Sequence, residues 1–457
     1  MDTYATQPVS GSAETRPQLR RVLTRSDLVL YGLVILTPTA AYPVFGIVQQ
    51  VSQGHAALSY LVAMVAMLCT AASYGKMARA FPAAGSTYTY ARLALHDHVG
   101  FLAGWAMILD YVLIPLLSAV YVSITAVRLV PQVPYWAWAF LFAALITLIN
   151  IRGIQVTARA SRIMMLIMAT STVLFIGLAI HHVLNMAGAS GLIVPAAVFD
   201  PATFSVGPLM LGAGIAALSF LGFDAVSTLA EDSRNPKDDI AFATLAVCAL
   251  QAIFCFAIVY LAAVVWPASR PFGNIETAIL DISQIIGGTE MFGFTTFVLL
   301  VAGVASSLTS QAGASRLLYG MGRDRVLSNR IFGYIHPKYS TPTRSIWLMG
   351  VISFVGALMV GFQLIVELVS FGALVGLILV NLSVIRHYYF QQRLRSGVQF
   401  WTNLVFPGVG TLVCSYVWMS LSFHAKLVGF AWLAIGLIYL AVRTRGFRRP
   451  GLQLELP

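Results

Sequence analysis

Long apolar runs recur along almost the whole chain, and this repetition limits the possible folds more than any other feature. A helix needs about 20 residues to cross the roughly 30 Å apolar layer of a bilayer. Lipid offers the backbone no hydrogen-bond partners, so each crossing segment has to be helical. Twelve runs reach this length or come close to it: 28–51, 58–78, 97–127, 134–151, 161–184, 207–230, 241–266, 290–314, 346–361, 363–385, 402–421 and 425–442. The sequence therefore predicts an all-α membrane protein with 12 transmembrane helices.

The composition supports the same conclusion, because the chain has too few charged residues to cover a water-soluble surface. Of 457 residues, 58% are hydrophobic and 10% are charged, whereas soluble domains are about 25% charged. The mean hydropathy is +0.82. We therefore expect the lipid bilayer to cover most of the molecule.

The basic residues predict the orientation of the chain. With the amino terminus in the cytoplasm, 25 of the 28 Lys and Arg residues fall in cytoplasmic segments, and only Arg128, Arg270 and Lys426 fall on the other side. Cytoplasmic loops of membrane proteins carry this excess of positive charge. The net charge of +11 is thus interpreted as topological, and no nucleic-acid partner is expected. Both termini are expected in the cytoplasm.

The sequence lacks the patterns of an enzyme or an ATP-driven pump. None of its eight histidines forms an HxxxH or HExxH pair, and no GxxxxGK[ST] motif occurs. The four cysteines all fall inside apolar runs, without metal-ligand spacing. We therefore expect a protein without catalytic activity, metal or cofactor.

Two of the apolar runs are predicted to contain interrupted helices. The first run includes Pro38 and Pro43, each of which removes a backbone donor and clashes with the preceding turn. The sixth run contains three glycines between positions 212 and 222, close to Ser219 and Asp224. Transporters with inverted repeats bind their substrates at such interruptions. Runs one and six stand five apart, which is the spacing that a five-plus-five repeat requires.

Three longer motifs resemble those of the amino acid–polyamine–organocation permeases. They are Phe81–Tyr90 with Gly100–Trp105, Ser219–Glu231 with Asn235 and Pro236, and Ser315–Asp324 running on to His336–Pro342. Shorter stretches resemble the bacterial putrescine importers of this superfamily: Leu36–Pro38, Phe45–Ile47, Ser73–Lys76, Leu109–Tyr111 and Phe332–Pro337.

This resemblance implies a LeuT-like fold, in which two inverted repeats of five helices are followed by two further helices. The corresponding division is a cytoplasmic tail over 1–27, a transport core over 28–385 with repeats at about 28–184 and 207–385, and helices 11 and 12 with a cytoplasmic tail over 386–457. The resemblance also implies a proton-coupled importer in the bacterial inner membrane.

The candidate substrate residues lie at the two interruptions and in the third run. An ammonium group binds carboxylates, carbonyls or aromatic faces. The first interruption has no glycine and two residues without N–H donors, so it is poorly supplied for a substrate carboxylate. The expected substrate-binding residues are Thr37, Pro38, Tyr42, Asp110, Tyr111, Ser219, Phe220, Gly222, Phe223 and Asp224.

Asp110 and Asp224 have the strongest reason to bind an amine, since a charge at the bilayer centre costs about 2.5–3.5 kcal/mol without a partner or a cavity. For Asp224, capping of a half-helix or a role in gating is an equal alternative.

Coupling residues are harder to identify. Some proton-coupled relatives use a lysine in the fifth span, and this chain has none there, so a proton would pass through Asp110, Asp224 or Glu367. The alternative for Glu367 is a role at the start of its helix, where a carboxylate interacts favourably with the helix dipole. Ser306 and Ser307 could instead complete a sodium site, although packing is the simpler role for such hydroxyls. A co-transported proton is therefore expected before sodium.

The leading hypothesis is an importer of a small organic amine, with putrescine-like polyamines first. Pro43 stands where putrescine importers carry an acid, which favours a monoamine over a dication. A neutral amino-acid transporter or exchanger of the same fold is the alternative. A channel or sensor without turnover is a third hypothesis.

Overall fold

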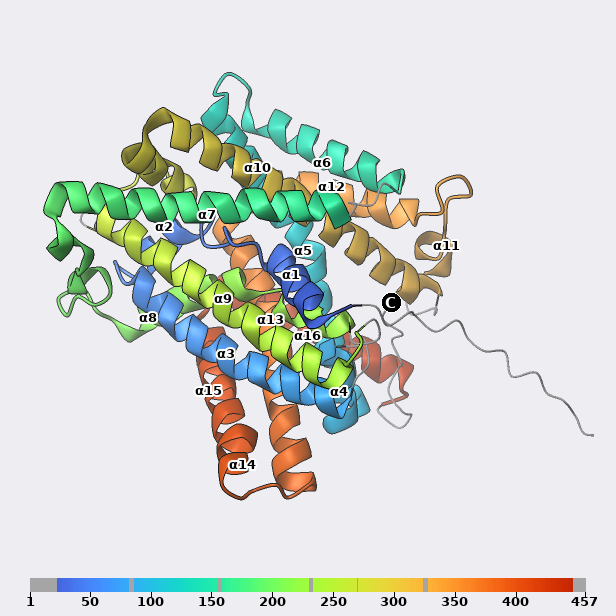
Figure 1. Cartoon of the computed structure of the whole chain (residues 1–457). Helices are drawn as coiled ribbons and strands as arrows, with labels where there is room; N and C mark the ends of the chain where they lie inside the picture. Colours follow the sequence, from blue (N-terminus) through green and yellow to red (C-terminus); the bar gives the residue numbers. More distant parts are fainter. Residues whose placement is uncertain are drawn as a thin grey trace, which may run out of the picture.

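The computed structural model describes residues 23–81, 86–153, 158–229, 233–268, 270–323 and 328–446 (Figure 1). Every regular element in these ranges is helical, apart from one isolated bridge between Leu23 and Ser233. Most of the predicted amino-terminal tail, the end of the carboxy-terminal tail and parts of the three family motifs lie outside the described residues.

The α-helices include the predicted spans, in the same order, and several shorter segments. They are α1 (Arg25–Leu36), α2 (Phe45–Val51), α3 (Ala56–Ala80), α4 (Ser86–Ala94), α5 (Asp97–Leu129), α6 (Tyr135–Ile151), α7 (Ala158–Ala187), α8 (Val206–Ala216), α9 (Pro236–Val265), α10 (Ala278–Arg323), α11 (Asn329–Phe332), α12 (Thr343–Met359), α13 (Phe362–Val384), α14 (Val398–Phe400), α15 (Phe406–Ser420) and α16 (Phe423–Arg443).

Short 3-10 and π-helical turns connect them. The 3-10 turns are η1 (Ala189–Leu192), η2 (Pro195–Ala197), η3 (Ala217–Phe220), η4 (Phe223–Leu229) and η5 (Ile275–Thr277). The π-helical turns are η6 (Ile385–Gln391) and η7 (Trp401–Val405), which continue α13 and precede α15.

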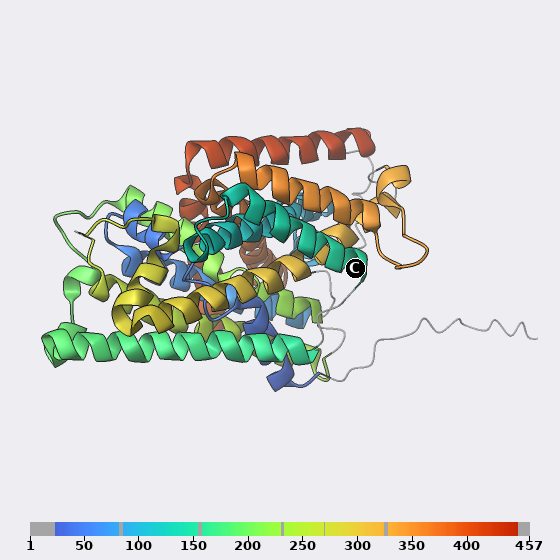
Figure 2. The same ribbon diagram turned by 90° about the horizontal axis from the view of Figure 1, so that it is seen from above.

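Eight helices in the described part are long and apolar enough to cross a membrane, and α6, α8 with η3, and α12 are shorter apolar helices. The prediction of an all-helical chain with many apolar spans is therefore confirmed for the described residues. Figure 2 shows α7 and α16 on opposite sides of the bundle. Both expose large apolar side chains, such as Val173 on α7 and Val442 on α16, which are 64% and 73% exposed.

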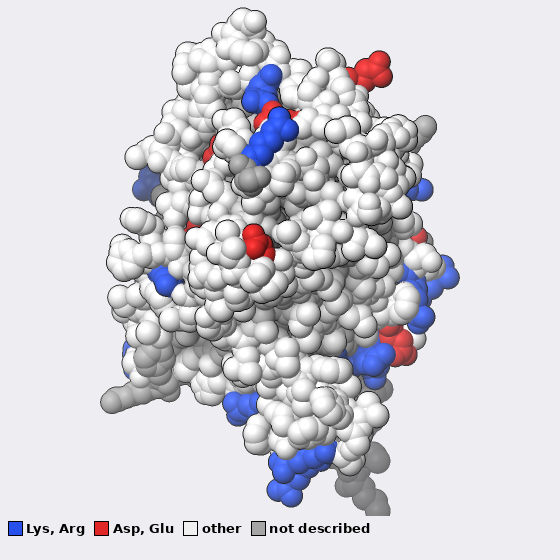
Figure 3. All heavy atoms as spheres, turned by 90° about the vertical axis from the view of Figure 1, so that its left-hand side faces the viewer, with Lys and Arg blue, Asp and Glu red and all other residues white. Residues whose placement is uncertain are grey.

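Charged side chains are sparse on the surface as well as in the composition. Figure 3 shows one face of the molecule, where uncharged side chains cover nearly everything and the charged ones form small separate groups. Only three salt bridges occur among the described residues. Such a surface is suited to lipid, because a bilayer interior cannot hydrate charges.

The first span is interrupted, as predicted. Helix α1 ends at Leu36, residues 37–44 form turns, and α2 begins at Phe45. Pro38 and Pro43 lie within this interruption, and neither can donate a backbone hydrogen bond. Thr37 has a φ of 54°, which turns the chain away from the helix axis.

The sixth span is also interrupted as predicted. Helix α8 ends at Ala216 and tightens into η3, and the chain becomes extended at Leu221 before η4 begins at Phe223. Gly222, between them, has a φ of 116°, a conformation that residues with a Cβ rarely adopt. The two half-helices of this span therefore depend on that glycine.

The eighth span differs from the prediction of 290–314. Helix α10 begins at Ala278 and ends at Arg323, with a kink at Gly287 and Gly288. Gly288 has a φ of 65°, so the segment before it forms a separate arm. The sequence did not predict this arm as part of the span, because the arm is short and carries a charged residue, Asp281.

Candidate substrate site at the two helix breaks

Ser219 connects the two interrupted spans directly. It lies in η3, is 1% exposed, and donates its hydroxyl hydrogen bond to the carbonyl oxygen of Ala40 in the first interruption (3.2 Å). The hydroxyl of Tyr60 on α3 is 2.8 Å from the Ser219 Oγ. A backbone carbonyl that lost its helical partner thus regains a hydrogen bond from the other broken span, as membrane depth requires.

Gln251 on α9 makes a second connection. Its Nε2 donates to the carbonyl oxygens of Thr37 and Ser219, each at 3.0 Å, and lies 3.5 Å from that of Leu36. With the amide nitrogen facing these carbonyls, the amide oxygen must face away from them. That oxygen is buried and has no hydrogen-bond partner among the described residues. The arrangement leaves one fixed, desolvated acceptor beside the two interruptions.

The two intramembrane acids lie close together. Asp110 is on α5 and is 8% exposed, and Asp224 is on η4, just after the second interruption. The two carboxyl groups are near enough to interact electrostatically, and Tyr111 interacts with both. Oδ1 of Asp110 is buried without a hydrogen-bond partner in the described part of the chain. Two interacting carboxyl groups in a low dielectric cannot both be charged without cost, so such a pair favours the binding of a cation or a proton.

Several aromatic side chains lie near Asp224 and contact one another. Tyr74 on α3 hydrogen bonds to the hydroxyl of Thr87 on α4. The Tyr74 ring centroid lies 5.4 Å from that of Phe223 and 5.9 Å from that of Tyr90. Tyr74 and Tyr90 also interact electrostatically with Asp224. These rings offer the aromatic faces that cations favour.

The other predicted residues have different surroundings. Tyr42 is 1% exposed, donates to the carbonyl oxygen of Ser171 on α7 (3.3 Å) and contacts the Phe175 ring (5.4 Å). Phe220 is fully buried against Tyr60. Thr37 contributes its backbone carbonyl, through Gln251. These residues therefore belong to the framework that fixes the two interruptions.

Glu367 lies inside α13 and is 1% exposed. One carboxylate oxygen accepts from the side chain of Gln363 (2.9 Å), and the other accepts from the backbone N–H of Ser422 (3.0 Å). Because Ser422 caps α16, Glu367 joins α13 to the turn between α15 and α16. Because α13 begins at Phe362, these contacts give no support to the alternative role of Glu367 at the start of its own helix; its coupling role stays a prediction.

Ser306 and Ser307 lie on α10, where Ser307 is 2% exposed. This part of α10 packs against α5 and α6. Gly303 lies against Val122, and Leu308 packs against the cluster that contains Val122, Phe142 and Ile146. No hydrogen bond in the described part links either side chain to the first interruption. The predicted sodium site therefore gains no support from these contacts, and it stays untested.

Sequence reasoning missed four polar residues at the site: Tyr60, Tyr74, Tyr90 and Gln251. Only Gln251 carried a usable signal, since a glutamine inside an apolar run needs a hydrogen-bond partner at membrane depth. The tyrosines come from α3 and α4, outside both interruptions. Only the tertiary packing brings Tyr60 to Ser219, and Tyr74 and Tyr90 to Asp224.

Comparison with known proteins agrees with this architecture. Residues 44–445 match the model of the family described as amino acid permease. The chain therefore belongs to the amino acid permease family, and it is a multi-pass membrane transporter and not an enzyme.

Several curated relatives match over nearly the full length. The chain is 33% identical over 445 residues to the low-affinity putrescine importer PlaP of Escherichia coli (strain K12), covering 96% of this chain and 97% of that protein. It is 25% identical to the branched-chain amino acid permease BcaP of Bacillus subtilis (strain 168), covering 96% of each chain. It is 24% identical to the methylthioribose transporter of the same organism, covering 97% of this chain and 96% of that protein.

Proposed function

We propose that this protein is a secondary active importer of a small organic amine, with putrescine-like compounds first, that works by alternating access. The observation that carries this proposal is the buried carboxyl group of Asp110 beside Asp224, at the second helix interruption. An ammonium group placed there would find an acceptor in Oδ1 of Asp110, which has no hydrogen-bond partner among the described residues. The similarity to a putrescine importer over 96% of the chain supports the same substrate class.

The first interruption supports an amine over a carboxylate as the recognised group. Pro38 and Pro43 lack N–H donors, and Val44, the N-cap of α2, makes no side-chain capping hydrogen bond. The carbonyl oxygens of Leu36, Thr37 and Ala40 at this interruption accept hydrogen bonds from the side chains of Gln251 and Ser219. A site rich in acceptors suits a donor-bearing cation.

The proposed arrangement has twelve crossings in a LeuT-like order. The eight long apolar helices, the three shorter ones and the broken pair α1 and α2 together provide twelve segments. In this arrangement residues 28–184 and 207–385 are the inverted repeats, and both termini lie in the cytoplasm of a bacterial cell, as the distribution of basic residues predicts.

A proton is the proposed coupling ion. Helix α7 carries no lysine or acid within its apolar part, and Glu367 is already bonded to Gln363 and Ser422. We propose that the acid pair Asp110 and Asp224 carries both partners, with the proton on one carboxyl group and the amine at the other. Binding of both in the same step would couple their inward movement.

Replacing Asp110 by Asn tests the proposal. The variant should lower kcat/KM for labelled putrescine in proteoliposomes by about 10- to 100-fold, since hydrogen bonds to charged groups contribute about 1.5–3 kcal/mol. Glu290→Gln, an exposed acid on α10, is the matched control and should leave uptake unchanged. Unchanged kcat/KM in Asp110→Asn would contradict the proposed role of this residue.

The alternative substrate is a neutral amino acid, which the 25% identity to a branched-chain amino acid permease supports. Competition distinguishes the two, because unlabelled diamines should inhibit putrescine uptake and neutral amino acids should not. The reverse pattern would establish the alternative. Counterflow excludes a channel, since substrate on the trans side accelerates labelled uptake through a carrier only.

A further inference from the structure

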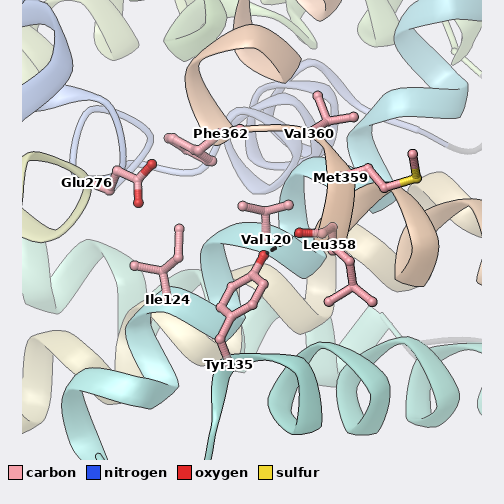
Figure 4. Close-up of a pocket in the computed structure, with 10 residues that line it drawn as sticks. Val120, Ile124, Tyr135, Glu276, Leu358, Met359, Val360 and Phe362 are labelled. Atoms are coloured by element: carbon pink, nitrogen blue, oxygen red, sulfur yellow. Dashed lines mark hydrogen bonds between the residues drawn. The ribbon is translucent and has the colours of Figure 1, made fainter.

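A recess of about 340 Å³ opens between the end of α5, the start of α6, the turn η5 and the connection between α12 and α13 (Figure 4). It lies outside the site at the two interruptions. Ten residues line it, and all but Tyr135 and Glu276 have apolar side chains or none. The loops around it belong to the side of the chain that carries few basic residues, which the proposed orientation places outside the cell.

Glu276 gives this recess a negative charge. It lies in η5, where the side chain of Asn274 accepts a hydrogen bond from the Glu276 backbone N–H (2.9 Å). Its side chain is half-buried, and no hydrogen bond or ion pair to its carboxylate is found among the described residues. A carboxylate held in an apolar recess without a cation has a strong electrostatic preference for one.

The nearby basic side chains are engaged elsewhere. Arg128, at the end of α5, pairs with Asp281 of α10. The Arg270 guanidinium lies 3.8 Å from the centre of the Trp266 ring. Lys426 donates to the carbonyl oxygen of Met419 (2.8 Å). These are the three basic residues that the charge distribution assigns to this side, and none of them pairs with Glu276 in the part of the chain that the structure describes.

Tyr135 adds a neutral acceptor. Its hydroxyl donates to the carbonyl oxygen of Ala357 (2.9 Å), so its single proton is committed and its oxygen faces the recess as an acceptor. It is near enough to Glu276 to interact with it electrostatically. The recess therefore combines one carboxylate, one hydroxyl acceptor and apolar walls, which together fit an alkyl chain ending in an ammonium group.

We propose that this recess is a second, outer binding site for alkylammonium compounds, from which the substrate passes to the acid pair. This inference rests on the proposed function. Phe362 lines the recess and its ring lies 5.6 Å from that of Tyr121 on α5. Asp110 stands eleven residues before Tyr121 on the same helix, about 16 Å at 1.5 Å per residue. Helix α5 thus carries both a wall of the recess, at Val120 and Ile124, and the acid of the central site, Asp110.

Equilibrium binding of labelled putrescine to the purified protein tests the outer site, using the wild type, Asp110→Asn, Glu276→Gln and Glu290→Gln. The wild type and Glu290→Gln should bind two molecules per chain. Glu276→Gln and Asp110→Asn should each bind one. In proteoliposomes Glu276→Gln should raise KM for putrescine about 2- to 5-fold with kcat unchanged, because only recognition before the transport step is weakened.

The outcomes separate this inference from the proposed function. The wild type could instead bind a single amine that is lost in Asp110→Asn and kept in Glu276→Gln, with the KM of Glu276→Gln unchanged. That result would contradict the outer site and leave the proposed function intact. A protein that binds no amine contradicts both. Tyr135→Phe, which removes the hydroxyl acceptor together with its hydrogen bond to Ala357, should raise KM less than Glu276→Gln does. If Glu276→Gln raised the inhibition constant of a neutral competitor by the same factor as the KM for putrescine, the change would be a general distortion of the recess. That result would contradict recognition of charge by Glu276.

Discussion

At the scale of single residues, the polar groups of this protein differ in how fully they are satisfied. Glu367 is buried but accepts two hydrogen bonds, so its surroundings already explain its presence. Asp110 and Gln251 are buried with one acceptor atom each that has no partner in the described part of the chain. A buried unsatisfied acceptor costs about 1–3 kcal/mol. These two residues are therefore better candidates for binding substrate than Glu367.

Gln251→Leu should impair both stability and transport. The change removes the donor for carbonyl oxygens in both interrupted spans, leaving buried polar groups without a partner. We expect the free energy of unfolding to fall by about 1–3 kcal/mol and the maximal uptake rate to fall with it. Thermal unfolding in detergent and initial uptake rates provide the measurements.

Gln284→Leu is the control for this change, because Gln284 is exposed on α10 and bonds only to Thr289 among the described residues. It should resemble the wild type in both assays. If Gln251→Leu behaved like this control, the connection between the two interruptions would have no energetic importance.

At the scale of elements, local sequence signals account for where several helices begin and break. Helix α1 begins after Thr24, whose hydroxyl accepts from the N–H of Asp27, while the Asp27 carboxylate accepts from the N–H of Thr24. This capping box is a readable start signal, and it sets the helix start three residues before the predicted 28. Pro43 and Gly222 mark the breaks in the same local way.

Gly222→Ala should destabilise the second interruption. The φ of 116° at this position is strained for any residue with a Cβ, so we expect a loss of about 1–2 kcal/mol and reduced putrescine uptake. Thermal unfolding and uptake rates report the two effects.

Gly207→Ala is the matched control, since a Cβ at Gly207 has nothing within 4 Å. It should leave both quantities unchanged. A normal unfolding temperature in Gly222→Ala would show that the turn after Leu221 does not need this backbone conformation.

At the scale of the whole molecule, the last helix is tied to the core by reciprocal contacts. The indole nitrogen of Trp105 on α5 donates to the carbonyl oxygen of Trp432 on α16, and that of Trp432 donates back to the carbonyl oxygen of Trp105, each at 2.9 Å. The two rings stack with centroids 4.9 Å apart. Helix α5, which carries Asp110, is thus held from the outer side of the bundle (Figure 2).

Cysteine accessibility tests the proposed orientation. Ser190 and Ser396 are exposed and fall on opposite sides of the membrane in the predicted topology. A membrane-impermeant maleimide should label Ser190→Cys in intact cells and Ser396→Cys only after permeabilisation. Labelling of Ser396→Cys in intact cells, with Ser190→Cys protected, would reverse the orientation. Cys248, Cys255 and Cys414 are buried, and Cys69 is partly exposed, so a Cys69→Ser background keeps native labelling low.

The sequence alone was enough to predict the helical class, many apolar spans and the two interruptions, because these depend on local properties. Apolar length predicts a span, proline removes a donor, and glycine permits a positive φ. It also identified Asp110 and Asp224, since an acid in an apolar run is conspicuous wherever it lies in space.

Only the tertiary structure decided which side chains meet at these places. Gln251 joins residues 214 and 32 positions away in the chain, and Tyr74 reaches the acid pair from another helix. The recess at Glu276 likewise forms from segments between positions 120 and 362. Contacts between distant segments depend on how the helices pack, and the hydrophobic pattern of one chain does not encode that packing in a form that can be read locally.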